Sequence, residues 1–89
     1  MIERQGIINN AFGIHCRPAD IIRKAADGFQ GKLEIVGADG TVANPHKILS
    51  ILTLALTKGD HFIVRAEGPG EEEIADKLVS LLETSFDFQ

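Results

Sequence analysis

The chain has 89 residues, of which 44% are hydrophobic and 25% are charged, proportions typical of one soluble globular domain with a single core. Its formal net charge of −4 argues against nucleic-acid binding, and no apolar run is long enough to span or insert into a membrane. The first residues, Met1 to Gly6, do not resemble a secretory signal. We therefore expect a single domain over residues 1–89.

Cysteine and histidine usage restricts the chemistry further. Cys16 is the only cysteine, so an intramolecular disulfide is impossible, which fits a reducing, cytoplasmic location. The positions of Cys16 and of the three histidines, His15, His46 and His61, do not match the ligand spacing of a zinc site. We expect neither a metal ion nor another cofactor.

The hydrophobic periodicity predicts elements in the order β-α-β-β-α-β-α. We expect strands at residues 2–8, 32–36, 41–43 and 61–66. Helices are expected at residues 16–28, from Pro45 to Leu56, and from Glu71 onward. Asn44 is the predicted N-cap of the second helix, with Pro45 at its first position. The acidic run at residues 71–73 fits the start of a helix better than a metal site.

This order of elements indicates an α+β fold. We expect an open-faced β-sandwich, in which three helices cover one face of a four-stranded antiparallel sheet. The second predicted helix carries more apolar residues than one buried stripe needs. Either part of its surface is exposed and marks a partner site, or a loop or the tail Ser85 to Gln89 covers the surplus.

The stretch from Phe12 to Ala19 carries the strongest functional pattern. Gly13 permits a sharp turn and Pro18 fits a first helical turn, so His15 is expected beside free backbone N–H groups at a helix N-terminus. Such a position binds anions, and the Arg17 guanidinium suits phosphoryl oxygens. A neutral imidazole is a competent nucleophile, so His15 could accept a phosphoryl group. Alternatively, His15 is a cap or surface residue and Arg17 is a solvated charge.

Three segments resemble the histidine-containing phosphocarrier (HPr) family of the phosphoenolpyruvate-dependent phosphotransferase system. Gly13-Ile14-His15-Cys16-Arg17-Pro18-Ala19 is similar to its active-site motif. The segment from Lys47 to Leu56 resembles its second helix, and the segment from Gly59 to Gly68 resembles its fourth strand and the following turn. The order and spacing of these segments match the family over nearly the whole chain.

The resemblance implies a small, cytoplasmic, monomeric carrier rather than an enzyme that turns over independently. It would accept phosphate on His15 from enzyme I and pass it to enzyme II A domains. Arg17 would stabilise the phosphoryl charge, and Cys16 and Arg17 would lie at the phosphate-binding helix start. The partner-binding surface would comprise an apolar patch with Lys24 at its rim and Lys47 favouring acidic partners; the patch residues are Ile48, Leu49 and Leu52.

Two positions depart from the family pattern. Cys16 stands where the family has alanine or a small hydroxyl residue, and we interpret it as a tolerated small side chain rather than the thiol of an enzyme or redox sensor. Lys47 stands where many members carry a kinase-regulated serine, so this switch should be absent; the nearest hydroxyl is Ser50. The remaining alternative is an HPr-fold regulatory binding module that docks a partner without obligatory phosphotransfer.

Overall fold

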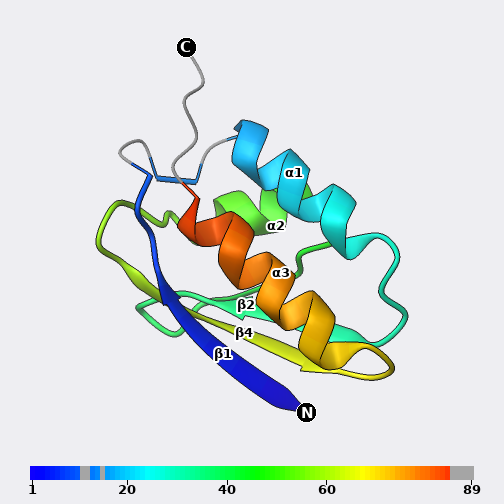
Figure 1. Cartoon of the computed structure of the whole chain (residues 1–89). Helices are drawn as coiled ribbons and strands as arrows, with labels where there is room; N and C mark the ends of the chain where they lie inside the picture. The colour runs from blue at the N-terminus through cyan, green and yellow to red at the C-terminus, as the bar shows by residue number, and fades with distance from the viewer. Residues whose placement is uncertain (11–12, 15, 85–89) are drawn as a thin grey trace.

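The structure is a computed structural model that describes residues 1–10, 13–14 and 16–84. In this part of the chain the elements are β1 (Ile2–Ile7), α1 (Cys16–Ala26), β2 (Lys32–Val36), β3 (Val42–Ala43), α2 (Ile48–Leu52), β4 (His61–Glu67) and α3 (Glu71–Glu83). The strands form one antiparallel sheet in the order β1-β4-β2-β3. The helices lie over one face of this sheet, which confirms the predicted open-faced α+β sandwich (Figure 1).

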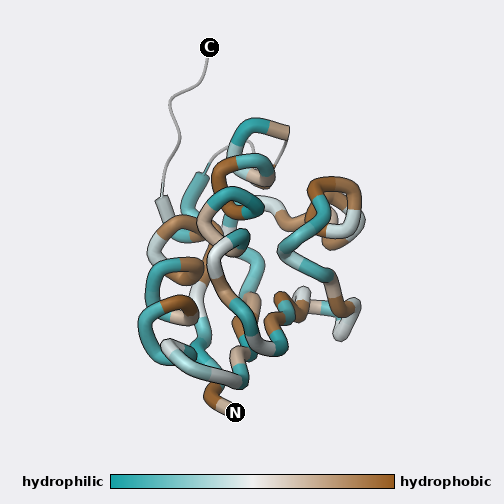
Figure 2. Tube along the Cα trace, turned by 90° about the vertical axis from the view of Figure 1, so that its right-hand side faces the viewer, coloured by the Kyte–Doolittle hydropathy of each residue, from teal (hydrophilic) through white to brown (hydrophobic). Residues whose placement is uncertain are grey.

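The core lies between the sheet and the helix layer. Alternate residues of β4, Phe62, Val64 and Ala66, are buried beneath the helices. Facing them are the apolar stripes of α1 and α3, whose buried residues are Pro18, Ala19, Ile22, Ala26, Ile74, Ala75, Leu78 and Leu82. Hydrophobic and hydrophilic positions alternate along the trace, as elements with one buried face require (Figure 2).

The outer face of the sheet is more polar. Arg65 of β4 lies between its two paired neighbours, Glu3 of β1 and Glu34 of β2, which are its Cα partners in the sheet. Its Nε donates to the Glu3 carboxylate at 2.7 Å, and its guanidinium is 4.0 Å from that of Glu34. The two sheet faces therefore differ as the alternation in residues 61–66 predicts.

The second helix differs most from its prediction. It covers only Ile48–Leu52, and its N-cap is Lys47 rather than Asn44. The prediction that this helix begins at Pro45 was wrong, because Asn44 forms a separate turn before the helix. Its side-chain oxygen accepts the His46 N–H at 3.0 Å, and its carbonyl accepts the Lys47 N–H at 3.1 Å.

The predicted end of this helix was also wrong, because α2 ends at Leu52 and Thr53 is its C-cap. Leu54 and Leu56 are buried in the core outside α2, and Ala55 between them is exposed with a left-handed φ of 51°. The other predicted boundaries agree with the structure to within two residues. The tail Ser85 to Gln89, one of the covers considered for the apolar surplus, lies outside the described residues.

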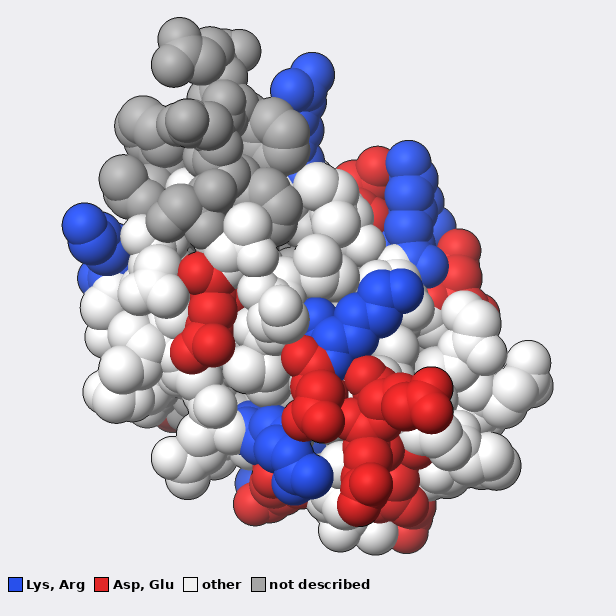
Figure 3. Space-filling view, viewed as in Figure 1, with Lys and Arg blue, Asp and Glu red and all other residues white. Residues whose placement is uncertain are grey.

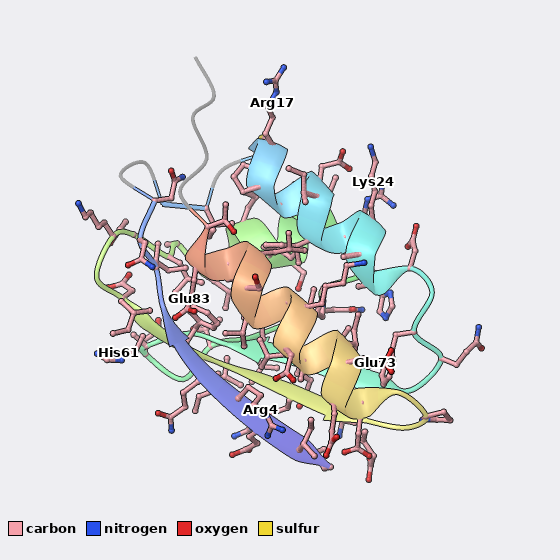
Figure 4. The ribbon with its side chains drawn as sticks, in the orientation of Figure 1. Arg4, Arg17, Lys24, His61, Glu73 and Glu83 are labelled. Carbon is pink, nitrogen blue, oxygen red and sulfur yellow. The ribbon has the colours of Figure 1, made fainter. Side chains whose placement is uncertain are left out.

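Polar contacts fasten β1 to α3 along its length. Near the middle of both elements, Arg4 Nε donates to an Asp76 carboxylate oxygen at 3.1 Å. Where both elements end, a Glu83 carboxylate oxygen accepts the Ile7 N–H at 3.1 Å, and the Glu83 carbonyl accepts the side-chain amide of Asn9 at 3.1 Å. Figure 4 labels Arg4 and Glu83. The end of α3 therefore anchors the segment through which the chain leaves β1.

Candidate functional site

The start of α1 provides the expected setting for an anion. The helix begins at Cys16, and Pro18 is buried in its first turn, where a missing N–H costs nothing. An eleven-residue helix directs its first backbone N–H groups and the positive end of its dipole toward this start. The predicted phosphoryl acceptor, His15, precedes Cys16 in the sequence and lies outside the described residues.

Arg17 and Lys24 lie on the same side of α1. Seven residues separate them, which is close to two helical turns, so their side chains leave the helix in similar directions. Both are exposed, and Figure 4 shows Arg17 pointing away from the body of the molecule at the helix start. Cys16 is also exposed. The structure thus brings Cys16 and Arg17 together at the helix start and places Lys24 further along the same helix.

Lys24 is part of a small ion-pair group on α1. Its Nζ is 3.2 Å from one Asp20 carboxylate oxygen, and Arg23 Nη2 is 3.0 Å from the other. Hydrogen bonds from Arg23, and then from Lys24, hold the pKa of the Asp20 carboxyl below its usual range. Asp20 therefore stays ionised at neutral pH and partly offsets the charge of Lys24.

Gly13 makes a close backbone contact that an amino acid with a side chain could not make at this position. Its φ is +67°, and a Cβ added there would collide with the carbonyl oxygen of Leu56. The next residue, Ile14, donates its N–H to the same carbonyl at 3.1 Å. The absence of a side chain at Gly13 therefore lets the chain approach α1 directly against the backbone that follows α2.

Asn10 is a component of this site that the sequence analysis missed. Asn10 follows the strand predicted at residues 2–8 and is not among the predicted site residues, yet it is only 2% exposed. Its side-chain Nδ2 donates to the Gly13 carbonyl at 2.6 Å, while its own carbonyl accepts the Gly13 N–H at 3.0 Å. An asparagine three residues before a glycine is typical of a β-turn, and this spacing was the available indication.

A second set of backbone contacts joins the residue after β1 to the segment before β4. Ile8 donates its N–H to the Asp60 carbonyl at 2.9 Å and accepts the Gly59 N–H at 2.8 Å. The Asp60 carboxylate in turn accepts the Thr57 N–H at 2.9 Å. The segment after β1 and the segment before β4 are therefore joined at both Ile8 and Ile14.

The predicted docking residues lie on α2, which packs against α1. Leu49 is 78% exposed, whereas Ile48 and Leu52 are half-buried against the core. Helical geometry places these three within an arc of about 100°. We define Ile48, Leu49 and Leu52 as the α2 patch. The exposed Lys47 directly precedes it.

Ser50 has a structural role next to the α2 patch. Its hydroxyl oxygen accepts the Asn44 N–H at 2.8 Å. This bond closes the turn that begins α2, so a phosphate on this hydroxyl would disturb the turn. The nearest hydroxyl to Lys47 is thus already used by the fold.

Charge is distributed unevenly over the molecule. Figure 3 shows the largest acidic group toward the end where α3 begins, away from the start of α1. The first turn of α3 contributes Glu71, Glu72 and Glu73. Within the described ranges, no group of three or more His, Cys, Asp or Glu residues could hold a metal ion. No helix in that part of the chain is long and apolar enough to cross a membrane.

Comparison with known proteins decides the family. The family model described as "PTS HPr component phosphorylation site" matches residues 2–84. The chain belongs to the HPr family. It is 34% identical over 83 residues to the phosphocarrier protein HPr of Mycoplasma pneumoniae, covering 93% of this chain and 94% of that protein. It is 32% identical over 80 residues to the phosphocarrier protein NPr of Escherichia coli, covering 90% and 89% respectively.

The fold comparison agrees with the family assignment. The crystal structure of HPr-C-His from Thermoanaerobacter tengcongensis superimposes with a TM-score of 0.86 at 31% identity, covering 100% of this chain and 99% of that one. Membership of the HPr family places the chain among the phosphocarriers of the phosphotransferase system. The exposed start of α1 and the α2 patch are therefore surfaces of an HPr-family phosphocarrier.

The Gly13 contact predicts a position-specific loss of stability. Gly13→Ala should lower the free energy of unfolding by about 2–6 kcal/mol, because left-handed strain adds to a collision with the Leu56 carbonyl. Gly59→Ala is the matched control, since Gly59 also has a positive φ, +91°, but its Cβ would meet open space. That control should lose only the strain, about 1–3 kcal/mol. Urea unfolding measures both; equal losses would contradict the close approach at Gly13.

Proposed function

We propose that this HPr-family chain accepts a phosphoryl group on His15 from enzyme I and passes it to enzyme II A domains. It would do so as a monomeric, single-domain protein in the cytoplasm. The observation that carries the proposal is the start of α1 at Cys16, immediately after His15 in the sequence, with Arg17 exposed in the first turn. This arrangement offers donors for the phosphoryl oxygens beside the nucleophile.

The proposed transfer requires little chemistry from the protein. An unprotonated imidazole nitrogen of His15 forms a bond to phosphorus while the bond from phosphorus to the donor breaks. Charge on the phosphoryl oxygens is stabilised by the α1 N–H groups and by the Arg17 guanidinium. In the second transfer the direction is reversed: the acceptor attacks phosphorus and the bond from phosphorus to the imidazole breaks. Exposure of the helix start supports this function, because two different partners must reach it.

The α2 patch supports the docking half of the proposal. An exposed leucine beside two half-buried apolar side chains offers a small surface for a partner. α1 and α2 are in contact, so a partner seated on this patch would also lie near the α1 residues Arg17 and Lys24. The two cations would then meet acidic groups on that partner.

The proposal predicts one phosphoryl group on His15. After incubation with enzyme I and phosphoenolpyruvate, mass spectrometry should find a single modification that is labile in acid and persists in alkali, as expected of a P–N bond. His15→Ala is the control and should remain unmodified. Phosphate on His46 or His61, with His15 bare, would contradict the assignment. A chain that stays unmodified would favour the regulatory binding module.

The exposed guanidinium predicts a graded effect at Arg17. Arg17→Ala should slow phosphoryl transfer by the equivalent of about 1–3 kcal/mol in the barrier, because a charge-assisted hydrogen bond is lost. Arg17→Lys should have a smaller effect, since it keeps the charge but not the planar fork. Lys32→Ala, on β2, controls for the loss of one exposed cation. Quenched-flow kinetics measure the transfer rate of each variant. An Arg17→Ala rate equal to that of the parent would show that Arg17 is only a surface charge.

The α2 patch predicts a separation of binding from folding. Leu49→Asp should weaken enzyme I binding by about 10-fold to 100-fold, the equivalent of burying one leucine side chain. Because Leu49 is exposed, the Tm should change little. Val42→Asp provides the control, since Val42 is also an exposed apolar residue but lies on β3. Calorimetric titration and thermal melts measure the two effects; a large fall in Tm for Leu49→Asp would mean that Leu49 stabilises the fold.

A further inference from the structure

We infer that Asn10 is a positioning residue for phosphoryl transfer at His15. The inference rests on the proposed function and concerns a residue that does not itself touch the reacting atoms. Asn10 is buried, and it is fixed to Gly13 by two hydrogen bonds. Gly13 is the second residue before His15 in the sequence, so Asn10 acts on the backbone that leads to the phosphoryl acceptor.

The decisive geometry is at the peptide unit between Gly13 and Ile14. Its carbonyl oxygen accepts a hydrogen bond from Asn10 Nδ2 at 2.6 Å. Its N–H donates to the Leu56 carbonyl at 3.1 Å. A peptide unit is planar and rigid, so bonds at both ends fix its orientation as well as its position. Asn10 therefore supplies one of the two polar anchors of this unit.

The same residue also fixes the preceding peptide unit. The Gly13 N–H donates to the Asn10 carbonyl at 3.0 Å. Ile14 is buried on the other side of the doubly anchored unit, and α1 begins two residues later at Cys16. The described residues on both sides of position 15 are thus held by the fold.

The chemistry of the asparagine side chain suits this role. An amide has N–H donors, whereas the Gly13 carbonyl can only accept. At an almost fully buried position, loss of the amide leaves the carbonyl without this partner and in a site where water is largely excluded. The peptide unit could then rotate about its remaining bond to Leu56. A misplacement of about 1 Å can reduce a transfer rate about 100-fold.

The test measures phosphorylation of the intact chain by enzyme I and phosphoenolpyruvate. For Asn10→Ala we expect kcat to fall by about 10-fold to 100-fold with KM nearly unchanged, because the α2 patch is intact. Leu49→Asp should show the opposite split, a raised KM with kcat retained. Ala75→Gly, in α3, controls for a general loss of stability and should leave both constants at the parent values. Thermal melts confirm that each variant is folded at the assay temperature.

A second variant keeps the inference testable if Asn10→Ala does not fold. Asn10→Asp preserves the shape, but its carboxylate cannot donate to the Gly13 carbonyl. Its protonated form can donate, so the ratio of variant to parent rate should rise as the pH is lowered through the pKa of the introduced carboxyl group. The parent chain, measured at every pH, is the reference for this ratio. A purely structural role would leave this ratio flat while the variant stays folded.

The outcomes separate the inference from the proposed function. A parent chain that takes no phosphate would overturn the proposed function and the inference with it. A phosphorylated parent together with folded Asn10 variants that keep the parent kcat and a flat rate ratio would overturn the inference alone. A lower kcat at unchanged KM, or a ratio that rises toward acid, supports it.

Discussion

The contact between Gly13 and the Leu56 carbonyl is the constraint on which the functional end of the molecule depends. It joins residues that are 43 positions apart in the chain. The Leu56 carbonyl also accepts the Ile14 N–H, and Ile8 pairs with Gly59 and Asp60 just beyond it. The chain therefore enters α1 along a backbone already fixed by α2 and β4. A side chain at Gly13 would separate these two segments.

The segment that brings Leu56 to Gly13 also contains a strained residue, Ala55. Among the described residues other than glycine, Ala55 alone has a positive φ. Such a conformation costs about 1–3 kcal/mol. Its neighbours Leu54 and Leu56 are both buried, and burial of two leucine side chains contributes about 3–6 kcal/mol. The hydrophobic gain exceeds the strain, so the chain accepts a left-handed alanine in order to bury both leucines and present the Leu56 carbonyl to Gly13.

The sequence predicted well those helices and strands whose residues follow a regular local pattern. The apolar spacing of α1 and α3 and the alternation in β4 predicted those elements, and Pro18 indicated where α1 begins. The exposure of Leu49 agrees with the surplus of apolar residues in the second predicted helix. The length of α2 could not be predicted from leucine spacing, because buried residues continue past its end in a non-helical segment. Asn10 was missed because its spacing to Gly13 indicates a turn but not burial, and its importance comes from burial.

A carrier that serves two partners needs a particular balance of surface and support. On the proposed function, donor and acceptor must reach the same histidine in turn, so each complex must dissociate before the next can form. A small apolar surface such as the α2 patch suits brief complexes of this kind, since affinity grows with well-packed anchors rather than with charge alone. Ordering the acceptor anew in each of these complexes would cost conformational entropy, which a small docking surface offsets poorly. The orientation must then be supplied by the carrier itself, which is the role that the anchored peptide unit between Gly13 and Ile14 can perform.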